Sequence, residues 1–323
     1  MNIKISVIIP TYNRPILLLK CLKALIAQNF RKTEYEIIIV SDGPDCQTKK
    51  IMNEWQIRKR VNLRFFSLPA KKGPAAARNY GWLNARGSLV AFTDDDCVPD
   101  KNWLSSFYNR HKADGEIVMS GKTIVPISKN PTDYERNIEH LQTADFITAN
   151  CCCTKKALSN AGGFDEQFTM AWREDSDLQF KLIKEGISIR KVNQAVVVHP
   201  IRQTKWGISI KEQKKTMFNA LLYKKYPELY RQKIQPSPPI HYYITIIAFL
   251  GMLTGLIIKA PEMYIGGFML WMGLSFLFLF RRLRTTTLAP SHLFEMAITS
   301  LCIPFISIYW QFYGAIKYRV LFL

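Results

Sequence analysis

The chain of 323 residues exceeds the roughly 250–300 residues that one hydrophobic core usually serves, so we expect a large domain and a second part. Lys and Arg outnumber Asp and Glu by 44 to 25, and the formal charge of +19 suits an anionic partner such as a nucleic acid, an acidic membrane surface or a phosphorylated substrate. Seven irregularly spaced cysteines, without a CxxC pair or a histidine at zinc-site spacing, exclude a disulfide framework and indicate a reduced, cytosolic catalytic domain.

The first ~235 residues alternate between strand-like and helix-like segments. Four short apolar runs, each bounded by turn residues, predict buried strands: residues 3–10, 35–40, 61–68 and 89–93. Three segments between them predict helices: residues 16–28, 47–55 and 74–85. The first run is too short for a secretory signal, and no cleavage site follows it. This alternation predicts an α/β fold, with a parallel sheet covered by helices on both faces.

Ligands of such sheets bind beyond the carboxyl ends of the strands. Four segments occupy such positions, directly after a strand or in the loop that follows one: residues 11–13 (Thr-Tyr-Asn), 41–43 (Ser-Asp-Gly), 71–73 (Lys-Lys-Gly) and 94–96 (Asp-Asp-Asp). We therefore expect the chemistry of the protein at this edge of the sheet.

The run Asp94, Asp95 and Asp96 is the strongest chemical signal. Adjacent carboxylates raise one another's pKa unless a cation neutralises them, and hard divalent cations prefer oxygen ligands. In an extended segment alternate side chains share a face, so we expect Asp94 and Asp96 to point together and Asp95 elsewhere. The alternative is an acidic turn exposed to water, but the hydrophobic strand that leads directly into the run favours a metal site.

Two further segments carry groups suited to a phosphate-containing substrate. In residues 73–79 (Gly-Pro-Ala-Ala-Ala-Arg-Asn), Gly and Pro set a turn and begin a helix, and Arg78 offers a planar cation with five donors. The alternative for Arg78 is a surface helix residue. Residues 174–177 (Glu-Asp-Ser-Asp) precede the amphipathic stretch 178–186, where acidic residues equally serve to cap a helix and stabilise its dipole.

Three features outside these motifs need separate interpretations. His199 follows an apolar run and is either a further metal ligand or a buried structural histidine. Trp172 either stacks on a ring of a bound ligand or packs inside the protein. The consecutive cysteines at 151–153 are predicted to be small, buried packing residues, since free Cys favours the interior.

The composition changes near Gln235. A Pro-rich linker over 235–239 precedes two charge-free stretches, 241–258 and 263–280, each about 27 Å long as a helix and close to the hydrocarbon core of about 30 Å. Only four residues separate them, so we expect a helical hairpin, and the basic residues that flank it place both outer ends in the cytoplasm. We predict a catalytic domain over 1–234, the linker over 235–239 and membrane-associated helices over 240–323.

A third hydrophobic stretch, about 293–313, contains Glu295 and Pro304 and is followed by Lys317 and Arg319. A third crossing would place these two basic residues outside, against the positive-inside tendency, whereas a re-entrant or interfacial element would avoid this. Both options stay open. In a soluble protein all three stretches would be core helices, but two adjacent charge-free segments of membrane length are hard to bury in water.

Six segments together resemble glycosyltransferase family 2, in order and spacing, over about residues 3–200. They are residues 6–14, the strand ending at Asp42, residues 73–79, the three aspartates, residues 162–166 (Gly-Gly-Phe-Asp-Glu) and residues 174–177. The resemblance implies a GT-A fold, which is Rossmann-like with a mostly parallel sheet. It also implies inverting transfer of a sugar from a nucleoside-diphosphate donor by a membrane-anchored enzyme of bacterial type.

The resemblance further implies roles for single residues. The residues that would hold the nucleotide are Thr11, Tyr12, Asp42 and Arg78. We group Asp95 with them. Asp94 and Asp96 would bind the divalent metal, Mn²⁺ or Mg²⁺, and His199 is the further candidate ligand. Asp175 would be the general base, and its place at a helix start should lower its pKa.

Some features depart from the family pattern. Ser41 stands where many relatives have an acid, which puts the ribose contact in doubt. Processive synthases of the family carry Gln-x-x-Arg-Trp, but this chain has only Gln-Thr-Lys-Trp at 203–206, so we expect single additions.

The expected partners are a nucleotide-sugar donor, the lipid bilayer and a membrane-associated acceptor such as a lipid-linked glycan, a glycolipid or a polysaccharide precursor. The expected place is the cytoplasmic membrane, with several spans and the catalytic domain in the cytoplasm. We expect no nucleic acid, because the basic residues form no stripe interleaved with aromatics. The alternatives are a metal-dependent nucleotidyltransferase and a non-catalytic membrane scaffold, although a scaffold should have lost the metal and base carboxylates.

Overall fold

The computed structural model describes residues 2–57, 61–111 and 115–322. The chain forms two compact units. The sheet unit comprises Met1–Pro126 and Glu139–Ile201, and the helical unit comprises Ile127–Ile138 and Arg202–Leu323. The helical unit therefore contains a short stretch from the middle of the chain as well as its C-terminal third.

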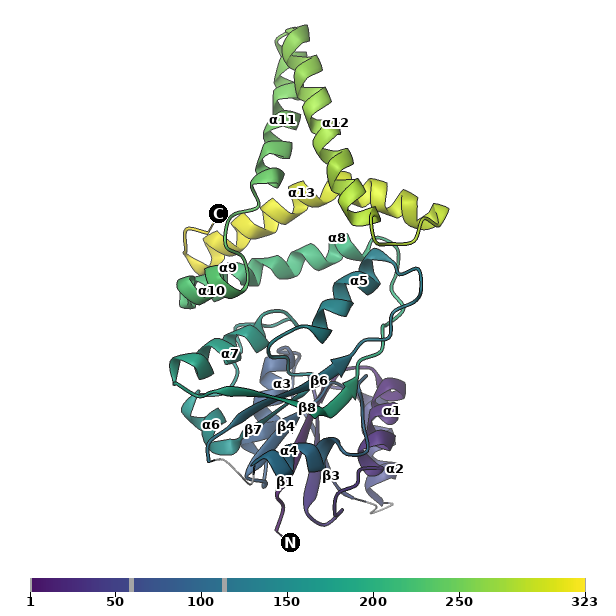
Figure 1. Cartoon of the computed structure of the whole chain (residues 1–323), viewed down its shortest axis with the longest axis vertical. Helices are drawn as coiled ribbons and strands as arrows, with labels where there is room; N and C mark the ends of the chain where they lie inside the picture. Colours follow the sequence, from purple (N-terminus) through teal and green to yellow (C-terminus); the bar gives the residue numbers. More distant parts are fainter. Residues whose placement is uncertain (1, 58–60, 112–114, 323) are drawn as a thin grey trace. The chain divides into compact units, whose positions relative to one another are not determined.

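One eight-stranded sheet forms the base of the sheet unit, with the order β3-β2-β1-β4-β7-β6-β8-β5 (Figure 1). Its strands are β1 (Ile5–Thr11), β2 (Tyr35–Ser41), β3 (Asn62–Ser67), β4 (Leu89–Phe92), β5 (Val98–Pro99), β6 (Val118–Ile124), β7 (Cys151–Thr154) and β8 (Ile189–Val198). The first four strands pair in parallel, as predicted. β7 is antiparallel to β4 and β6, and β5 is antiparallel to β8. The α/β fold is thus confirmed, but the second half of the sheet is mixed.

Helices cover both faces of this sheet, as predicted. One face packs against α1 (Pro15–Ile26), α2 (Cys46–Ile57) and α4 (Trp103–His111), and the other against α3 (Pro74–Leu83), α6 (Lys155–Asn160) and α7 (Glu174–Lys184). Side chains alternate between the two cores along each strand: Ile37 and Ile39 of β2 belong to one core, and Ile38 and Val40 to the other. This burial on both sides explains why the strands are continuous apolar runs in the sequence.

β7, in the middle of the sheet, contains the three consecutive cysteines. All three are fully buried, with Cys152 in one core and Cys151 and Cys153 in the other. Burial raises the pKa of the Cys151 and Cys152 thiols well above the usual range, so both stay uncharged. The prediction of small, buried packing residues is confirmed.

Three long apolar helices dominate the helical unit. Its elements are α5 (Asp133–Glu139), α8 (Ile208–Glu212), the 3-10 turn η2 (Gln213–Thr216), α9 (Met217–Lys225), α10 (Pro227–Lys233), α11 (Ile240–Ile257), α12 (Pro261–Leu283) and α13 (Pro290–Tyr318). The last residue of α5, Glu139, belongs to the sheet unit and is followed by the 3-10 turn η1 (His140–Gln142). α11, α12 and α13 match the three predicted stretches, and each is long and apolar enough to cross a membrane. α11 and α12 form the predicted hairpin (Figure 1), in which a Cβ on Gly255 would lie 2.5 Å from the Tyr264 amide nitrogen.

The two units divide at Arg202, well before the change of composition near Gln235. α8, η2 and α9 belong to the helical unit because they pack along α13. Residues 127–138 join them, and Arg282 near the end of α12 donates from Nη2 to Asp133 Oδ2 at 2.8 Å. The apolar helices therefore carry a polar layer formed by earlier residues. The functional boundary at residue 234 stays a prediction.

Gly121 lies where the pairing of β6 with β8 shifts register, between Gly121 and Lys122. There the Asn150 amide donates to the carbonyl oxygens of Lys122 and Ala195, each at 3.0 Å, and its Oδ1 accepts from Trp103 Nε1 at 2.8 Å. A Cβ on residue 121 would overlap the Ala195 carbonyl and the Asn150 side chain. This irregularity therefore requires a residue without a side chain.

We expect Gly121→Ala to lower the free energy of unfolding by about 1–3 kcal/mol, the usual cost of overpacking a filled interior. The Ala195 carbonyl cannot move aside without weakening its hydrogen bond from Asn150. Thermal unfolding of the purified full-length variant measures the loss. Gly115→Ala is the matched control, since a Cβ there would meet no atom within 4 Å. Equal melting temperatures for the two variants would contradict this account.

Candidate active site

The carboxyl ends of β1, β2 and β4 bring together the predicted ligand-binding segments. Parallel pairing sets Thr11 beside Ser41, and the Asp42 amide donates to the Thr11 carbonyl at 2.8 Å. On the other side of β1, the Thr93 amide donates to the Ile8 carbonyl at 3.3 Å and leads into the three aspartates. Loops that are far apart in the sequence thus meet at one edge of the sheet.

Asp94, Asp95 and Asp96 form a turn, because the Cys97 amide donates to the Asp94 carbonyl at 3.1 Å. We expected Asp94 and Asp96 to share a face because side chains alternate along an extended strand. This periodicity does not apply to a turn, so the expectation assumed the wrong backbone conformation. The three carboxylates instead have different neighbours, on β1, on α3 and after β8.

Asp95 is buried and turns toward the end of β1. Thr11 Oγ1 donates to Asp95 Oδ2 at 2.8 Å, and Arg14 Nη1 lies 3.4 Å from Oδ1. Burial raises the pKa of Asp95 to about 6, while Arg14 and Thr11 act in the opposite direction. Thr11 and Asp95, both predicted to contact a nucleotide, are bonded to each other here and hold the ends of β1 and β4 together.

Asp42 organises the loop that leads into α3. Its Oδ1 accepts hydrogen bonds from the amides of Lys72 at 2.8 Å and Gly73 at 2.9 Å. Gly73 has φ +105°, a conformation that favours glycine, and directly precedes α3. The ammonium of Lys71 lies 4.5 Å from the centre of the Tyr12 ring. Tyr12 and Asp42 therefore lie at the same loop, and their contact with a nucleotide stays a prediction.

Arg78, on α3, connects three elements of the site. Its Nη2 donates to Asp94 Oδ1 at 2.9 Å, and its Nη1 donates to Glu174 Oε1 at 3.1 Å. Only 3% of Arg78 and 2% of Glu174 is exposed, so the interpretation of Arg78 as a surface residue is wrong. Burial alone would lower the pKa of Arg78, but Asp94, Glu174 and Asp175 raise it, and the guanidinium stays charged.

Two adjacent carboxyl groups at the start of α7 have raised pKa values. Burial, together with the charge of Asp175, raises the pKa of Glu174, and the ion pair with Arg78 opposes this shift. Asp175 reaches the surface, and its Oδ2 accepts from the Thr148 amide at 3.3 Å. Burial also raises its pKa, Arg78 opposes this, and Asp94 adds to it. The expectation that the helix start lowers the pKa of Asp175 is therefore wrong, because burial outweighs the dipole.

The turn before α7 is strained. Arg173 has φ +73°, which is uncommon for a residue other than glycine, and its guanidinium lies 4.6 Å from the Trp172 ring. Trp172 is 36% exposed. Strained backbone of this kind is often found at ligand-binding sites. The exposure of Trp172 argues against the packing interpretation, and the stacking interpretation stays a prediction.

Asp96, Cys97 and His199 form a group whose potential ligand atoms lie within 4.8 Å of one another. His199 Nε2 is 3.9 Å from Asp96 Oδ1, and the buried His199 Nδ1 has no hydrogen-bond partner among the described residues. A carboxylate and an imidazole suit Mn²⁺ or a similar cation. The sulfur of Cys97 is a soft ligand, whereas Mn²⁺ and Mg²⁺ prefer oxygen. These residues therefore fit a divalent cation held by Asp96 and His199 better than by Cys97.

Several residues without a predicted role shape the site. Asn79 exchanges two hydrogen bonds with the Phe164 backbone, each at 2.9 Å, so the motif over 162–166 holds α3 in place. Asp45 accepts from the Asn13 amide at 2.7 Å and fixes the turn after β1, where Asn13 has φ +53°. The role of Asp45 was predictable, because an acid three residues before Thr48 is a typical helix cap. The role of Asn79 was not, because its partner Phe164 lies 85 residues away in the sequence.

Comparisons with known proteins show which family this chain resembles. The family model described as Glycosyl transferase family 2 matches residues 6–168. Glycosyltransferase AglE of Haloferax volcanii is 26% identical over 207 residues, which cover 61% of this chain and 67% of AglE. The pre-mycofactocin glycosyltransferase of Mycobacterium tuberculosis is 31% identical over 182 residues, covering 51% of this chain and 37% of the relative. The chain thus spans two thirds of the first relative and little more than a third of the second.

Two solved structures share the fold. The mannosyltransferase PcManGT of Pyrobaculum calidifontis, in complex with GDP-Man and Mn²⁺, superposes with a TM-score of 0.58 at 17% identity, covering 93% of this chain and 88% of that chain. Residues 1–349 of Staphylococcus aureus TarS, in complex with UDP-GlcNAc, give a TM-score of 0.52 at 16% identity, covering 92% and 90%. At these identities the likeness shows the fold. Because the family model covers half of the chain and the sheet unit has the GT-A-like fold, the protein belongs to glycosyltransferase family 2.

Proposed function

We propose that the protein transfers single sugar residues from a nucleoside-diphosphate sugar to a hydroxyl of a membrane-associated acceptor, with inversion at the anomeric carbon. Membership of the family supports transfer of a sugar. Both structural neighbours are described with a nucleotide sugar bound, which supports a donor of this class. The sequence 203–206, which lacks the processive Gln-x-x-Arg-Trp pattern, supports single additions.

The observation that carries this proposal is the meeting of Asp94, Glu174 and Asp175 around the buried guanidinium of Arg78. A diphosphate that leaves the sugar needs positive charge nearby, and an attacking hydroxyl needs a base. This cluster offers both beside the carboxyl ends of parallel strands, where ligands of such sheets bind.

Asp175 is the proposed general base, because it reaches the surface whereas Glu174 is buried. In the reaction the acceptor oxygen forms a bond to C1 of the sugar as the bond from C1 to the diphosphate oxygen breaks. The acceptor proton passes to Asp175, and the diphosphate leaves with the electron pair. One base suffices because an anionic diphosphate needs no proton to leave, unlike the leaving group of a glycosidase, which requires a second carboxyl as acid.

Asp96 and His199, with Asp94 as a further ligand, are the residues proposed to hold a divalent cation. Such a cation, when bound, would neutralise the charge that develops on the departing diphosphate. Arg78 adds positive charge from the protein itself. Thr11, Tyr12, Asp42 and Asp95 stay the proposed contacts of the nucleotide, directly or by ordering its loops.

The proposed acceptor is membrane-associated because three helices of this chain are long and apolar enough to cross a membrane. We place the enzyme at the cytoplasmic membrane with the sheet unit in the cytoplasm, as the basic residues that flank α11 and α12 favour. An acceptor anchored in the same bilayer meets the enzyme in two dimensions, which raises its effective concentration.

We expect UDP or GDP to bind the full-length protein more tightly with Mn²⁺ or Mg²⁺ than with a chelator, by at least tenfold. Asp96→Asn and His199→Ala should remove this gain, since each loses a proposed ligand, whereas Glu54→Gln on the exposed face of α2 should keep it. Calorimetric titration gives the affinities, and incubation with the matching nucleotide sugars gives the product. Undiminished metal-dependent binding in both site variants would refute the metal assignment. Release of pyrophosphate in place of a nucleoside diphosphate would indicate a nucleotidyltransferase.

Removal of Arg78 should destabilise the protein through the carboxylates that it leaves behind. We expect Arg78→Met to lower the free energy of unfolding by about 3–5 kcal/mol, the usual cost of breaking a buried ion pair on one side. The double variant Arg78→Met/Glu174→Gln should regain part of this loss, because the amide carries no charge. Thermal unfolding of the single and double variants forms the cycle. A double variant no more stable than Arg78→Met would show that the pair with Glu174 does not hold the site.

The raised pKa of Asp175 predicts a pH dependence of kcat. A base acts only when deprotonated, so kcat should fall as the pH drops through this pKa, above the usual aspartate value of 3.8. Asp175→Asn should lower kcat by roughly 10²–10⁴-fold, abolish this limb and change donor affinity far less than kcat. Rate profiles of Asp175→Asn, Glu174→Gln and Asp177→Asn measure this. Near-normal turnover of Asp175→Asn, with the loss in one neighbour instead, would move the base to that neighbour.

A further inference from the structure

The protein segments that pack on α13 indicate where this helix lies relative to a membrane. In its most apolar window 39% of the residues are buried inside the helical unit, against 17% in α11 and 6% in α12. The buried residues recur every three or four positions, and several are polar: His292, Thr299, Ser300, Ser307 and Gln311. One face of α13 therefore carries polar side chains among apolar ones such as Ile303 and Ile308, and this face packs against protein.

The segment 207–225 runs along this face from one end to the other. The Gly207 amide donates to Glu295 Oε1 at 2.7 Å near the start of α13, and Lys224 Nζ donates to the Tyr318 carbonyl at 2.8 Å at its end. These contacts are about 35 Å apart along a helix that rises 1.5 Å per residue, and the hydrocarbon core is about 30 Å thick. Any crossing by α13 would therefore take this segment with it.

That segment is too charged for the bilayer interior. Its ionisable residues are Lys211, Glu212, Lys214, Lys215, Lys224 and Lys225. Lys214 lies over the ring of Trp310, at 5.5 Å from its centre, and Trp310 comes eight residues, or about 12 Å, before the end of α13. This lysine therefore stands inside the helix pair and not at its ends. A lysine in the hydrocarbon interior is unfavourable, which makes a crossing of the pair unfavourable.

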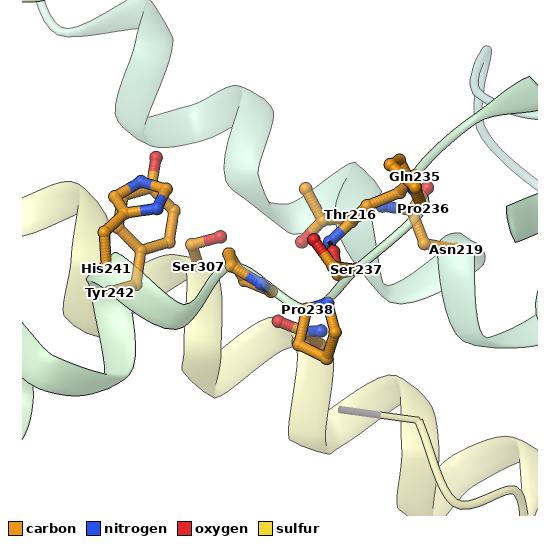
Figure 2. A pocket seen from close by; sticks show the side chains of 11 residues that line it. Thr216, Asn219, Gln235, Pro236, Ser237, Pro238, His241, Tyr242 and Ser307 are labelled. Atoms are coloured by element: carbon orange, nitrogen blue, oxygen red, sulfur yellow. Dashed lines mark hydrogen bonds between the residues drawn. The ribbon is translucent and has the colours of Figure 1, made fainter.

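A groove of mixed polarity lies on the same face of α13. It has a volume of about 480 Å³ and lies between η2, α9, the linker 235–239, the start of α11 and α13. Figure 2 shows Thr216, Asn219 and Ser307 among the polar side chains that line it, beside prolines of the linker. These polar groups need water or another hydrogen-bonding partner. The groove therefore suits a position in which this face of α13 borders water, next to the linker.

The opposite face of α13 is apolar and aromatic. Its exposed large side chains are Phe294, Tyr309, Phe312, Tyr313 and Ile316. Lys317 and Arg319 follow at the end of the helix, and Arg281, Arg282 and Arg284 precede it. Aromatic rings and basic side chains concentrate where the bilayer meets water. Residues 284–289 connect this face directly to the end of α12, so it begins where a spanning helix would leave the membrane.

We propose that α13 lies flat in the membrane–water interface, with its aromatic face immersed among lipid headgroups and its polar face held by α8, η2 and α9. The chain then crosses the membrane twice, through α11 and α12, and its C-terminus stays on the same side as α10. The basic residues around α13 fit an anionic lipid surface. This inference rests on the membrane association in the proposed function.

Cysteine labelling in cells tests the topology. In a background with Cys46 and Cys302 replaced by serine, the exposed positions Lys233→Cys, Lys259→Cys and Arg319→Cys are probed with an impermeant maleimide. We expect Lys259→Cys to react in intact cells, and the other two only after permeabilisation. Reaction of both Lys259→Cys and Arg319→Cys in intact cells would overturn the interfacial placement and leave the hairpin standing. Protection of Lys259→Cys in intact cells would overturn the hairpin, and with it both proposals of membrane topology.

Depth measurements on the full-length protein give a second test. Nitroxide labels at native Cys302, near the middle of α13, and at Phe294→Cys and Ile316→Cys, near its ends, report collision with oxygen in anionic lipid vesicles. An in-plane helix puts all three at a similar, shallow depth. A clear maximum of oxygen accessibility at Cys302 would mean that the middle of α13 lies at the bilayer centre, and would overturn the proposal.

Discussion

Gathering carboxylates at one edge of a sheet is unfavourable unless positive charge is held among them, and in this protein Arg78 provides it. The guanidinium bonds Asp94 after β4 and Glu174 on α7. Its own place depends on the loop before α3, which Asp42 fixes through the Lys72 and Gly73 amides. The position of Arg78 thus links the ends of β2 and β4 to the starts of α3 and α7, and removing it leaves buried charge that the fold cannot compensate.

Local pattern predicted the first half of the sheet unit well, because β1, β2 and β4 are buried on both faces and turn residues separate all four strands. β6 was missed because it reads Val-Met-Ser-Gly-Lys-Thr-Ile, where polar residues interrupt the apolar run. It is a strand because its neighbours supply the pairing. The edge of the sheet at which ligands bind was also predictable, because its position follows from where the strands end. The bonds between side chains were not, since Arg78 and Glu174 are 96 residues apart and no periodicity connects them.

In the helical unit, composition identified the three apolar stretches but left the third one open. Hydropathy averages over all faces of a helix, and the polar face of α13 is visible only when its partner is known. That partner, the segment 207–225, comes before the linker and has no apolar signal of its own. The change of composition near Gln235 marks where lipid-facing residues begin. The compact unit begins earlier, at Arg202, because packing and lipid exposure are different properties.

The pKa of Asp175 depends on opposing effects of burial, the helix start and neighbouring charges, and no single sequence motif reveals their balance. A helix start favours the carboxylate by about 0.3–1 kcal/mol, whereas one pKa unit corresponds to 1.36 kcal/mol, so modest burial is enough to reverse the dipole. Burial and the charge of Asp94 raise the pKa of Asp175, and Arg78 lowers it. Since Arg78 also bonds Asp94 and Glu174, its charge is shared among three carboxylates. A phosphate-containing donor that draws Arg78 or Asp94 into new contacts would therefore shift the proton affinity of Asp175, which couples donor binding to the strength of the base.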